Sequence, residues 1–308
     1  MTQKAFAGID VGGTNIKVGL VDGEGNVLSK TSFPTKPAEP AEVGLREAFQ
    51  KVEELLSDSA IPMDGLLAIG LATPGPMDIA SGSLLTPFNL PGWQNQNVRE
   101  KLAEISGYPV AFNNDANAAA FGEFWLGSGK HFDSMVLMTL GTGVGGGIII
   151  DDVLLAGSHS YGAEIGHVVV EPGDDARVCT CGNRGHLEAY ASATALVKRA
   201  KARLQAGVNS SLKPDESLTP LAVYHAAIEG DELARELISE IAFYAGTGIA
   251  SVSRIIDLQA VFIGGALTFG GGESEAGRKF VQQTRNRIKN CSLPGLPNKL
   301  IIDLATLV

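Results

Sequence analysis

The sequence predicts a two-domain α/β protein, and three observations lead to this class. The chain has 308 residues, which is enough for two domains of ordinary size. Short apolar runs alternate with segments of helical spacing, as in folds that pack helices against sheets. A strand, a glycine-rich turn and a second strand occur once in each half, within residues 5–22 and 134–157. We therefore expect two similar α/β domains, 1–114 and 115–308, facing each other across a cleft that holds both turns.

Further elements of the first half follow from hydrophobic spacing and from helix start signals. Strands are predicted at 5–10, 16–22, 66–72 and 108–114. Helices are predicted at 39–58, 97–106 and 115–127. The first of these helices is indicated by six apolar residues at helical spacing: Val43, Leu45, Phe49, Val52, Leu55 and Leu56.

The second half repeats this organisation after its glycine-rich turn. Helical segments are predicted at 187–206, 219–229 and 231–255, and a strand at 260–267. Polar or glycine-rich loops are predicted at 207–218 and 268–277. Each half thus adds a further strand and several helices to its strand-turn-strand unit.

Charge and composition exclude several classes of function. The net charge is −10, from 24 basic and 34 acidic residues, and no run of lysine and arginine occurs. A nucleic-acid or membrane partner would favour a positive field, so we expect neither. No apolar run approaches the ~20 residues that span a bilayer, and the N-terminus lacks the apolar core of a signal peptide. Three cysteines cannot all pair with one another, which favours a reducing cytoplasm over a disulfide framework.

The first glycine-rich turn lies in DVGGTNIKVGLVD, residues 10–22. It is neither a Walker A loop nor a dinucleotide-binding fingerprint, because it leads into a strand and lacks the required spacing. Consecutive backbone N–H groups in such a turn nevertheless suit an anion. The candidate phosphate contacts are Gly12, Gly13, Thr14 and Lys17, with Asp10 placed to orient Mg²⁺-bound water. Lys17 reads equally well as a solvated strand residue.

The second turn, LGTGVGGG at 140–147, offers another such set of N–H groups, with Thr142 and Gly143 as candidates. Either turn alone is explained as an ordinary hairpin whose glycines adopt positive φ. Two turns at equivalent places in two similar halves favour phosphate binding.

A carboxylate follows the strand in FNNDANAAAFGE, residues 112–123. Asp115 stands at the predicted start of a helix, where an aspartate commonly caps free N–H groups. The alternative is a catalytic base that takes a proton from a hydroxyl as the hydroxyl attacks a phosphoryl group. This stretch by itself leaves both readings open.

The two turns, together with IGGAL at 263–267, resemble the phosphate and adenosine elements of the sugar kinase, Hsp70 and actin superfamily. That resemblance implies the actin-like ATPase fold, each domain a mixed sheet flanked by helices, with Mg-ATP in the cleft. It also implies that Gly264 and Gly265 lie under the adenosine. An Hsp70-like ATPase is less favoured, because that class does not explain the sequence GAEIGH at 162–167.

The segment GSHSYGAEIGHVVVEPGDDARVCTCGNRGHLEAY, residues 157–190, resembles the signature of the ROK family of repressors and sugar kinases. This resemblance runs from Gly8 to about residue 306. It implies that Asp115 is the base and that a sugar is the substrate. The sugar-binding residues that it implies are Gly75, Asn89, Asn114, Asp115, Glu164, His167 and Glu188. Carboxylates and amides of this kind bind vicinal hydroxyls in pairs.

The family resemblance also ranks the possible activities. It implies an ATP-dependent hexokinase, with the 6-hydroxyl of glucose as the leading acceptor and a homodimer as the usual assembly. Kinases for N-acetylmannosamine, allose or fructose share most of the pattern. A sugar-sensing ROK repressor is the remaining alternative. Only seven residues precede Gly8 and the chain is acidic, which leaves no expected place for a DNA-binding domain.

The stretch CTCGNRGHLE, residues 179–188, admits a metal site, a redox pair or a tight turn. The two cysteines are closer than the usual zinc spacing of C-x₂₋₄-C, so spacing alone is a weak signal. The ROK resemblance favours a structural Zn²⁺ held by His167, Cys179, Cys181 and His186. His186 stands where the family commonly has a fourth cysteine. With all four positions taken by protein, the expected role is to fix the loop between His167 and Glu188.

Overall fold

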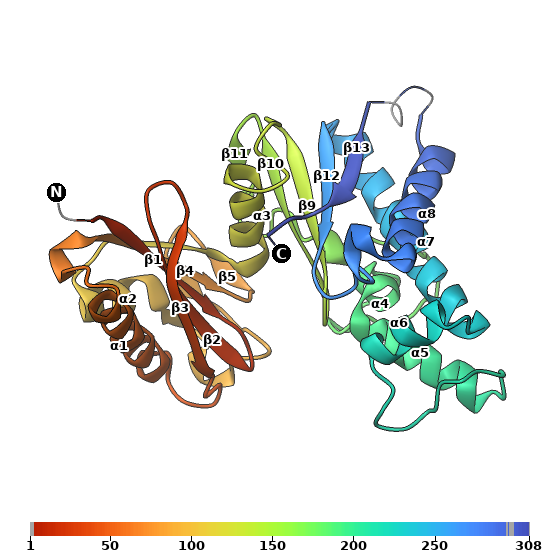
Figure 1. The fold of residues 1–308 in the computed structure, drawn as a ribbon, viewed down its shortest axis with the longest axis horizontal. Coiled ribbons are helices and arrows are strands. Elements are labelled where there is room, and N and C mark those ends of the chain that lie inside the picture. The colour runs from red at the N-terminus through yellow and green to blue at the C-terminus, as the bar shows by residue number, and fades with distance from the viewer. Residues whose placement is uncertain (1–2, 294, 296–298, 308) are drawn as a thin grey trace. The chain divides into compact units, whose positions relative to one another are not determined.

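Each glycine-rich turn joins two antiparallel strands of a five-stranded mixed sheet (Figure 1). The first sheet has the order β3 (Val27–Pro34), β2 (Asn15–Val21), β1 (Ala5–Val11), β4 (Leu66–Thr73) and β8 (Val110–Asn114). The second has the order β11 (Val153–Leu154), β10 (Val144–Ile150), β9 (Met135–Leu140), β12 (Ala260–Gly264) and β13 (Ile301–Leu304). In both, the last two strands run parallel to the first strand of the hairpin. This repeated sheet, flanked by helices, is the actin-like ATPase fold that the sequence predicts.

The computed structural model describes residues 3–293, 295 and 299–307. By their internal contacts, the residues form two units, Met1–Ala118 with Ala156–Gly162, and Ala119–Leu155 with Ala163–Val308. The first four residues of helix α3 (Asp115–Trp125) thus group with the first unit. The domain boundary predicted from the sequence lies instead ahead of Asp115. Among the described residues, no helix combines the length and apolar character needed to cross a bilayer.

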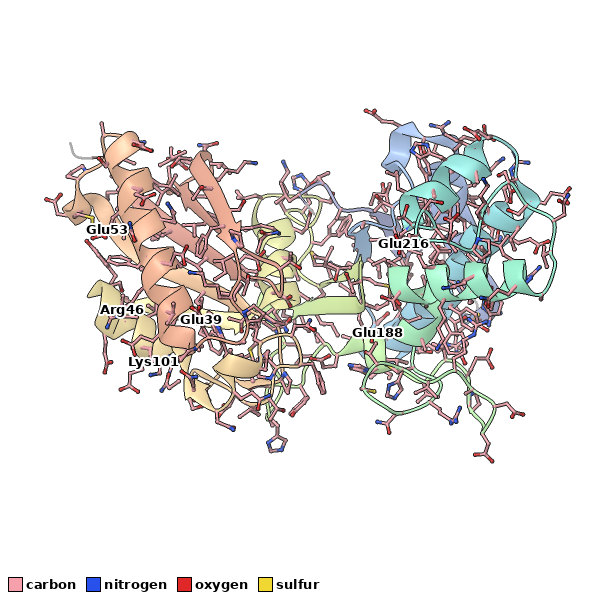
Figure 2. All side chains as sticks on the ribbon, turned by 90° about the horizontal axis from the view of Figure 1, so that it is seen from below. Glu39, Arg46, Glu53, Lys101, Glu188 and Glu216 are labelled. Atoms are coloured by element: carbon pink, nitrogen blue, oxygen red, sulfur yellow. The ribbon has the colours of Figure 1, made fainter. Side chains whose placement is uncertain are left out.

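In the first unit, one face of the sheet packs against α1 (Ala41–Asp58) and α2 (Val98–Ser106). Side chains of a strand point alternately to its two faces, and in β1 the alternate residues from Ala5 to Val11 are buried. Helix α1 buries the stripe Leu45, Ala48, Phe49, Val52, Leu55 and Leu56. Arg46 and Glu53 lie outside this stripe (Figure 2). Val43 was predicted in the apolar face but is 39% exposed, because it lies outside the stripe that contacts the sheet.

Short elements complete this unit. A three-stranded sheet is formed by β5 (Met77–Asp78), β6 (Ser83–Leu84) and β7 (Gln96–Asn97). Two 3₁₀ turns, η1 (Met63–Gly65) and η2 (Pro91–Trp93), precede β4 and β7. Trp93 of η2 is only 1% exposed and belongs to the same core as α1.

In the second unit, both faces of the sheet are covered. One core joins alternate residues of β9 and β12, such as Met138 and Ile263, to the helices that follow the second turn. Those helices are α4 (Glu188–Ala191), α5 (Ala193–Gln205), α6 (Pro220–Ile228), α7 (Glu232–Ile256) and α8 (Glu275–Cys291). The intervening residues of the same strands, such as Leu137 and Phe262, pack with Ala120 of α3. Buried on both faces, the central strands need the continuous apolar runs that their sequences show.

The sequence predictions for this unit are wrong in three details. The predicted helix 187–206 is broken at Ser192, which has extended backbone (φ −90°, ψ 162°) and caps α5 by accepting a hydrogen bond from the Ala195 N–H. The predicted strand 260–267 ends at Gly264. The predicted loop 268–277 contains the 3₁₀ turn η4 (Gly271–Glu273) and the start of α8, which Ser274 caps in the same way.

Glu123 of α3 holds the end of the described chain. Its side chain is 0% exposed and accepts hydrogen bonds from the Leu307 N–H, from the Thr306 hydroxyl at 3.3 Å and from the Ser128 N–H at 3.0 Å. A buried carboxylate is tolerated only where donors of this kind surround it. This group therefore fixes the segment after β13 against α3.

Replacing Glu123 by alanine is expected to lower the free energy of unfolding by about 1–3 kcal/mol, since it leaves three part-buried donors without their acceptor. Glu123→Gln keeps one acceptor oxygen and should lose about half as much. Urea unfolding at constant pH measures both values. Glu53→Ala, an exposed change on α1, is the control and should stay within about 0.5 kcal/mol of the parent protein. If Glu123→Ala lost no more unfolding free energy than Glu53→Ala, this role of Glu123 would be contradicted.

Candidate functional site

The carboxyl ends of β1, β4 and β8 bring the first group of predicted residues to one edge of the first sheet. Asp10 pairs with Ala72, and Thr73 with Asn114, in the registers of the parallel strands. Ligands of α/β folds bind at this edge. The Asp10 carboxylate lies 3.2 Å from the Lys17 ammonium across the hairpin, and both side chains are exposed. Lys17 is therefore paired with the Asp10 carboxylate next to the first glycine turn.

The first glycine turn is tied to the strands around it by backbone contacts. The Gly12 N–H donates to the Asn15 carbonyl at 3.0 Å, and the Thr35 hydroxyl donates to the Gly12 carbonyl at 2.7 Å. A Cβ atom at Gly13 would lie 3.1 Å from the Cβ of Asn89. A side chain at position 13 would therefore push Asn89 away, and glycine lets this predicted sugar ligand lie close to the first glycine turn.

At the start of α3, the capping contact belongs to Asn114 and not to Asp115. The Asn114 side-chain oxygen accepts from the N–H groups of Ala116, at 2.9 Å, and Asn117, at 3.3 Å. An N-cap side chain makes its contact with N–H groups two and three residues further on. The Asp115 carboxylate accepts from the next N–H, that of Ala116, at 2.8 Å. Helix capping, the simpler explanation of Asp115, is thus already provided by its neighbour.

Gly75 lies beside the same residues. A Cβ atom at Gly75 would be 3.8 Å from the side-chain nitrogen of Asn114, so the two positions are in contact distance. Asn113 accepts a hydrogen bond at 3.1 Å from the side chain of Asn117, which is 3% exposed. The first unit therefore groups Gly75, Asn114 and Asp115 on a supported strand-to-helix junction.

The second glycine turn makes direct contact with Glu188. The Val144 N–H donates to the Glu188 carboxylate at 3.2 Å, and a Cβ atom at Gly143 would lie 2.4 Å from the same oxygen. A side chain at position 143 would therefore displace that carboxylate from its present place. The Thr142 carbonyl accepts from the Thr194 hydroxyl at 2.8 Å, and the Gly141 carbonyl from the Ala193 N–H at 2.8 Å. Helix α5 therefore holds the turn through its first residues.

The glycines assigned to adenosine lie next to this turn. Gly264 ends β12 opposite Thr139 of β9. Gly265 has φ +90°, and a Cβ atom there would lie 2.6 Å from the Leu140 carbonyl, so both its backbone conformation and its surroundings require glycine. The predicted nucleotide residues of the second unit, Thr142, Gly143, Gly264 and Gly265, thus share one edge of the sheet.

The four predicted metal ligands come together in the second unit. One donor atom from each of His167, Cys179, Cys181 and His186 lies within 4.8 Å of all the others. The two histidine Nδ1 atoms are 3.3 Å apart, Cys181 Sγ lies 3.2 Å from His186 Nδ1, and Cys179 Sγ lies 3.8 Å from His167 Nδ1. Bond lengths of 2.0–2.3 Å around a tetrahedral zinc place ligand atoms about 3.3–3.8 Å apart, and the three separations given lie close to this range, so the donor set suits that ion.

The loop that carries the cluster depends on two glycines. Gly182 (φ +91°) and Gly185 (φ +80°) adopt left-handed backbone, and a Cβ atom at Gly185 would lie 2.0 Å from the Glu171 carbonyl. The turn from Cys179 to Asn183, which contains Gly182, is closed by the Cys179 N–H, which donates to the Asn183 carbonyl at 2.8 Å. The C-x-C-G-x-x-G pattern therefore sets the backbone that brings cysteine and histidine donors together.

Glu164, His167 and Glu188 are close neighbours of the cluster. His167 Nε2 lies 3.8 Å from the Glu164 carboxylate, on the opposite side of the ring from the cluster-facing Nδ1. Desolvation raises the pKa of Glu164 above its usual value; the His167 charge opposes this shift and Glu188 adds to it. Burial also raises the pKa of the Cys179 thiol to about 11 and lowers the pKa of His186.

Sequence reasoning missed Thr180, the residue between the two cysteines. Its hydroxyl donates a short hydrogen bond to the Glu188 carboxylate, and the Cys179 thiol lies 3.4 Å from the same oxygen. Figure 2 marks Glu188 at the start of α4. No spacing rule identifies such a residue, because its contact depends on how the loop folds back. The Ser192 cap of α5 was missed too, although a serine before an Ala-rich helical run is a recognisable signal.

Known proteins share both sequence and fold with this chain. The chain matches the ROK family over residues 6–292. It is 32% identical to a glucokinase of Halalkalibacterium halodurans, over all of this chain and 92% of the relative. It is 34% identical to the xylose repressor of Caldicellulosiruptor bescii, over 87% of this chain and 67% of the relative. A Streptomyces griseus ROK glucokinase, solved with glucose and AMPPNP, superposes with a TM-score of 0.78 at 31% identity, covering 98% of this chain and 95% of that one.

Most of the chain is covered by a single family description, the sequence identity is above 30% in whole-length relatives, and the fold repeats that of a solved member. The chain belongs to the ROK family.

Proposed function

We propose that this protein transfers the γ-phosphoryl group of ATP to the 6-hydroxyl of a hexose, with glucose as the leading acceptor. The observation that carries the proposal is the contact of Glu188, a predicted sugar ligand, with the Val144 N–H of the second phosphate turn. A predicted sugar ligand and a predicted phosphate turn thus lie in contact within one unit. Likeness to a glucokinase over the whole chain, and to a glucokinase structure with glucose and AMPPNP, supports the same reaction.

Asp115 is the proposed base. Its carboxylate takes the proton of the sugar O6 hydroxyl while O6 attacks the γ-phosphorus and the bond from that phosphorus to the ADP oxygen breaks. The bonding electrons leave with ADP, and the products are a hexose 6-phosphate, ADP and the proton on Asp115. Such a transfer needs positioning and charge neutralisation more than covalent chemistry.

The remaining predicted residues would position the two substrates. Gly75, Asn89, Asn114, Glu164, His167 and Glu188 would hold the sugar hydroxyls. The two glycine turns would donate N–H groups to the phosphates, with Thr14 and Lys17 from the first and Thr142 from the second. Asp10, an exposed carboxylate at the first turn, suits a water molecule on Mg²⁺, and that ion would neutralise charge on the transferred group.

A coupled assay of ADP formation across a panel of glucose, N-acetylmannosamine, allose and fructose tests the proposal. We expect the highest kcat/KM with glucose. A preference for another of these sugars would move the acceptor within the same reaction. Sugar binding without ADP formation with any of them would instead favour a sugar-sensing regulator, a possibility that the likeness to a xylose repressor keeps in view.

A structural Zn²⁺ at the His/Cys cluster is the second part of the proposal. Two thiolates and two neutral imidazoles make a neutral tetrahedral site, and the distances between the donor atoms suit it. The ion would hold the loop from His167 to Glu188 and take no part in proton or phosphoryl transfer. His167 would then present its other nitrogen, beside Glu164, to the sugar.

Thr180 is expected to position Glu188. In Thr180→Val the shape is kept but the hydroxyl is lost, so the Glu188 carboxylate loses one of the donors that hold it. We expect KM for the sugar to rise about 5–20-fold while KM for ATP stays within about 2-fold. Thr180→Ser retains the hydroxyl and should restore sugar affinity. Steady-state kinetics separate the two constants, and an equal effect of valine and serine would contradict the positioning role.

We further propose a cytoplasmic homodimer. The dimer is implied by the family resemblance, and a reducing compartment agrees with three cysteines that form no disulfide. Light scattering on the purified protein would give the mass of the assembly, to be compared with the 32.1 kDa chain.

A further inference from the structure

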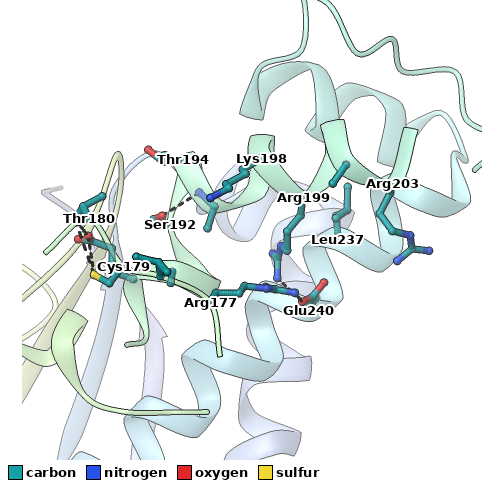
Figure 3. A pocket seen from close by; sticks show the side chains of 15 residues that line it. Arg177, Cys179, Thr180, Ser192, Thr194, Lys198, Arg199, Arg203, Leu237 and Glu240 are labelled. Atoms are coloured by element: carbon teal, nitrogen blue, oxygen red, sulfur yellow. Dashed lines mark hydrogen bonds and ion pairs between the residues drawn. The ribbon is translucent and has the colours of Figure 1, made fainter. Parts of the chain in front are cut away.

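A cavity of about 630 Å³ in the second unit is lined by more cationic than anionic side chains (Figure 3). The cationic residues are Arg177, Lys198, Arg199 and Arg203, and the anionic ones are Glu188 and Glu240. The volume falls within the usual range for small-molecule sites. None of these cationic residues has a part in the proposed phosphoryl transfer.

Two of the guanidinium groups share a single carboxylate. Arg177, two residues before Cys179, and Arg199 of α5 both contact the same oxygen of Glu240 in α7, at 2.9 and 2.5 Å. Figure 3 shows the three side chains converging from these different elements. One negative charge therefore faces two positive charges, and the group keeps an excess positive charge.

Arg199 is the group for which this imbalance matters most. It is 8% exposed, and among the described residues its Nε and Nη2 atoms are buried without a hydrogen-bond partner, as is Nη1 of Arg177. Buried N–H groups of a cation are costly to leave unpaired. Desolvation lowers the pKa of Arg199, and Glu240 opposes that shift only in part, since Arg177 adds to it.

Tyr190 holds Arg177 in place through both its side chain and its backbone. The Arg177 guanidinium lies 4.6 Å from the ring centroid of Tyr190, and the Arg177 backbone N–H donates to the Tyr190 hydroxyl at 2.8 Å. Preorganised guanidinium groups bind planar or tetrahedral oxyanions through paired hydrogen bonds. Lys198, an exposed residue of α5 that also lines the cavity, adds a further cation.

We propose that this cavity binds a phosphate group, carried by inorganic phosphate or by a small phosphorylated metabolite, through Arg177, Arg199 and Lys198. A dianion matches the excess positive charge and supplies acceptors for the unpaired N–H groups. The cavity is larger than a phosphate ion needs, and Val178, Ala195 and Leu237 offer apolar contact to an attached organic group. Of the residues proposed for sugar and nucleotide binding, only Glu188 lines this cavity, and its neighbours Cys179, Thr180 and Thr194 line it too.

Isothermal titration calorimetry with potassium phosphate, against potassium chloride of equal ionic strength, tests the site directly. We expect saturable binding to one site per chain. Lys198→Met should weaken the affinity about 3–10-fold, and Arg199→Met more than about 10-fold, since each removes a charged donor. Lys201→Met is the matched control, because Lys201 is an exposed lysine of the same helix that does not line the cavity.

Two further arms remove the remaining ambiguities. If Arg199→Met does not fold, the exposed pair Lys198→Met with Arg203→Met replaces it. Titration with glucose 6-phosphate, in the presence of saturating glucose and AMPPNP to occupy the proposed active site, distinguishes a phosphate ester from the free ion: tighter binding identifies the ester, and equal binding the ion. Absence of saturable binding, equal weakening by Lys201→Met, or loss of binding when glucose and AMPPNP are saturating would overturn the proposal. Because no turnover is required, failure of the kinase assay would leave this result standing.

Discussion

Asp115→Asn is expected to lower kcat at least 10²-fold, and up to about 10⁴-fold, while KM for the sugar stays within about 3-fold. Asparagine keeps the size and the hydrogen-bonding oxygen of the side chain but cannot accept a proton from the sugar hydroxyl. The binding contacts should therefore remain, and the loss should appear in the chemical step. Steady-state kinetics with saturating ATP give both constants. Near-normal turnover in this variant would show that another group accepts the proton.

Stability measurements separate this catalytic role from helix capping. Asn114 makes the capping contact, so Asn114→Ala should lose about 1 kcal/mol of unfolding free energy. Asp115→Asn should leave the unfolding free energy within about 0.5 kcal/mol of the parent protein. Asp64→Asn, at an exposed aspartate in the first turn of η1, controls for loss of one negative charge. The reverse order of stabilities would make Asp115 the cap.

The fold was predictable from the sequence because its repeated unit is local. A strand, a glycine turn and a strand are read from neighbouring residues, and the same unit appears in both halves as β1–β2 and β9–β10. The helix break at Ser192 was not predictable from periodicity, since apolar spacing continues through it. Its cause is a side-chain cap and a backbone contact from Ala193 to the second turn.

The candidate site divides in the same way. Residues such as Asp115 and Cys179 stand in recognisable motifs, and those motifs predict which other site residues lie near them. Other features depend on contacts between segments up to 63 residues apart. These are the hydrogen bond from Thr180 to Glu188 and the ion pairs of Glu240 with Arg177 and Arg199. Motif spacing carries no information about such contacts. They depend on the packing of α5 against α7 and on how the loop that carries Cys179 and Cys181 folds back on α4.

The cysteine variants provide the largest expected effect on structure. The purified protein should contain about one zinc per chain, and Cys179→Ser should contain less than about a tenth of that, because serine is a poor zinc ligand. Loss of the ion frees the loop that carries His167 and Glu188, so KM for the sugar should rise about 10–100-fold. Metal analysis and kinetics on one preparation measure both. Cys291→Ser is the control, since its thiol lies outside the cluster and bonds the Arg287 carbonyl at 3.0 Å.

His186 is the position at which this chain departs from the common ROK pattern, so it gives the sharpest test of the cluster. His186→Cys should keep the zinc, because a thiolate can replace the imidazole in a tetrahedral site, whereas His186→Ala should lose it. Retention of zinc in both variants would remove His186 from the ligand set. If the protein holds no zinc, and mild oxidation removes the free thiols of Cys179 and Cys181 together, the two cysteines form a redox pair instead. The convergence of two histidine and two cysteine donor atoms within 4.8 Å of one another favours the metal, because a redox pair needs only the two thiols.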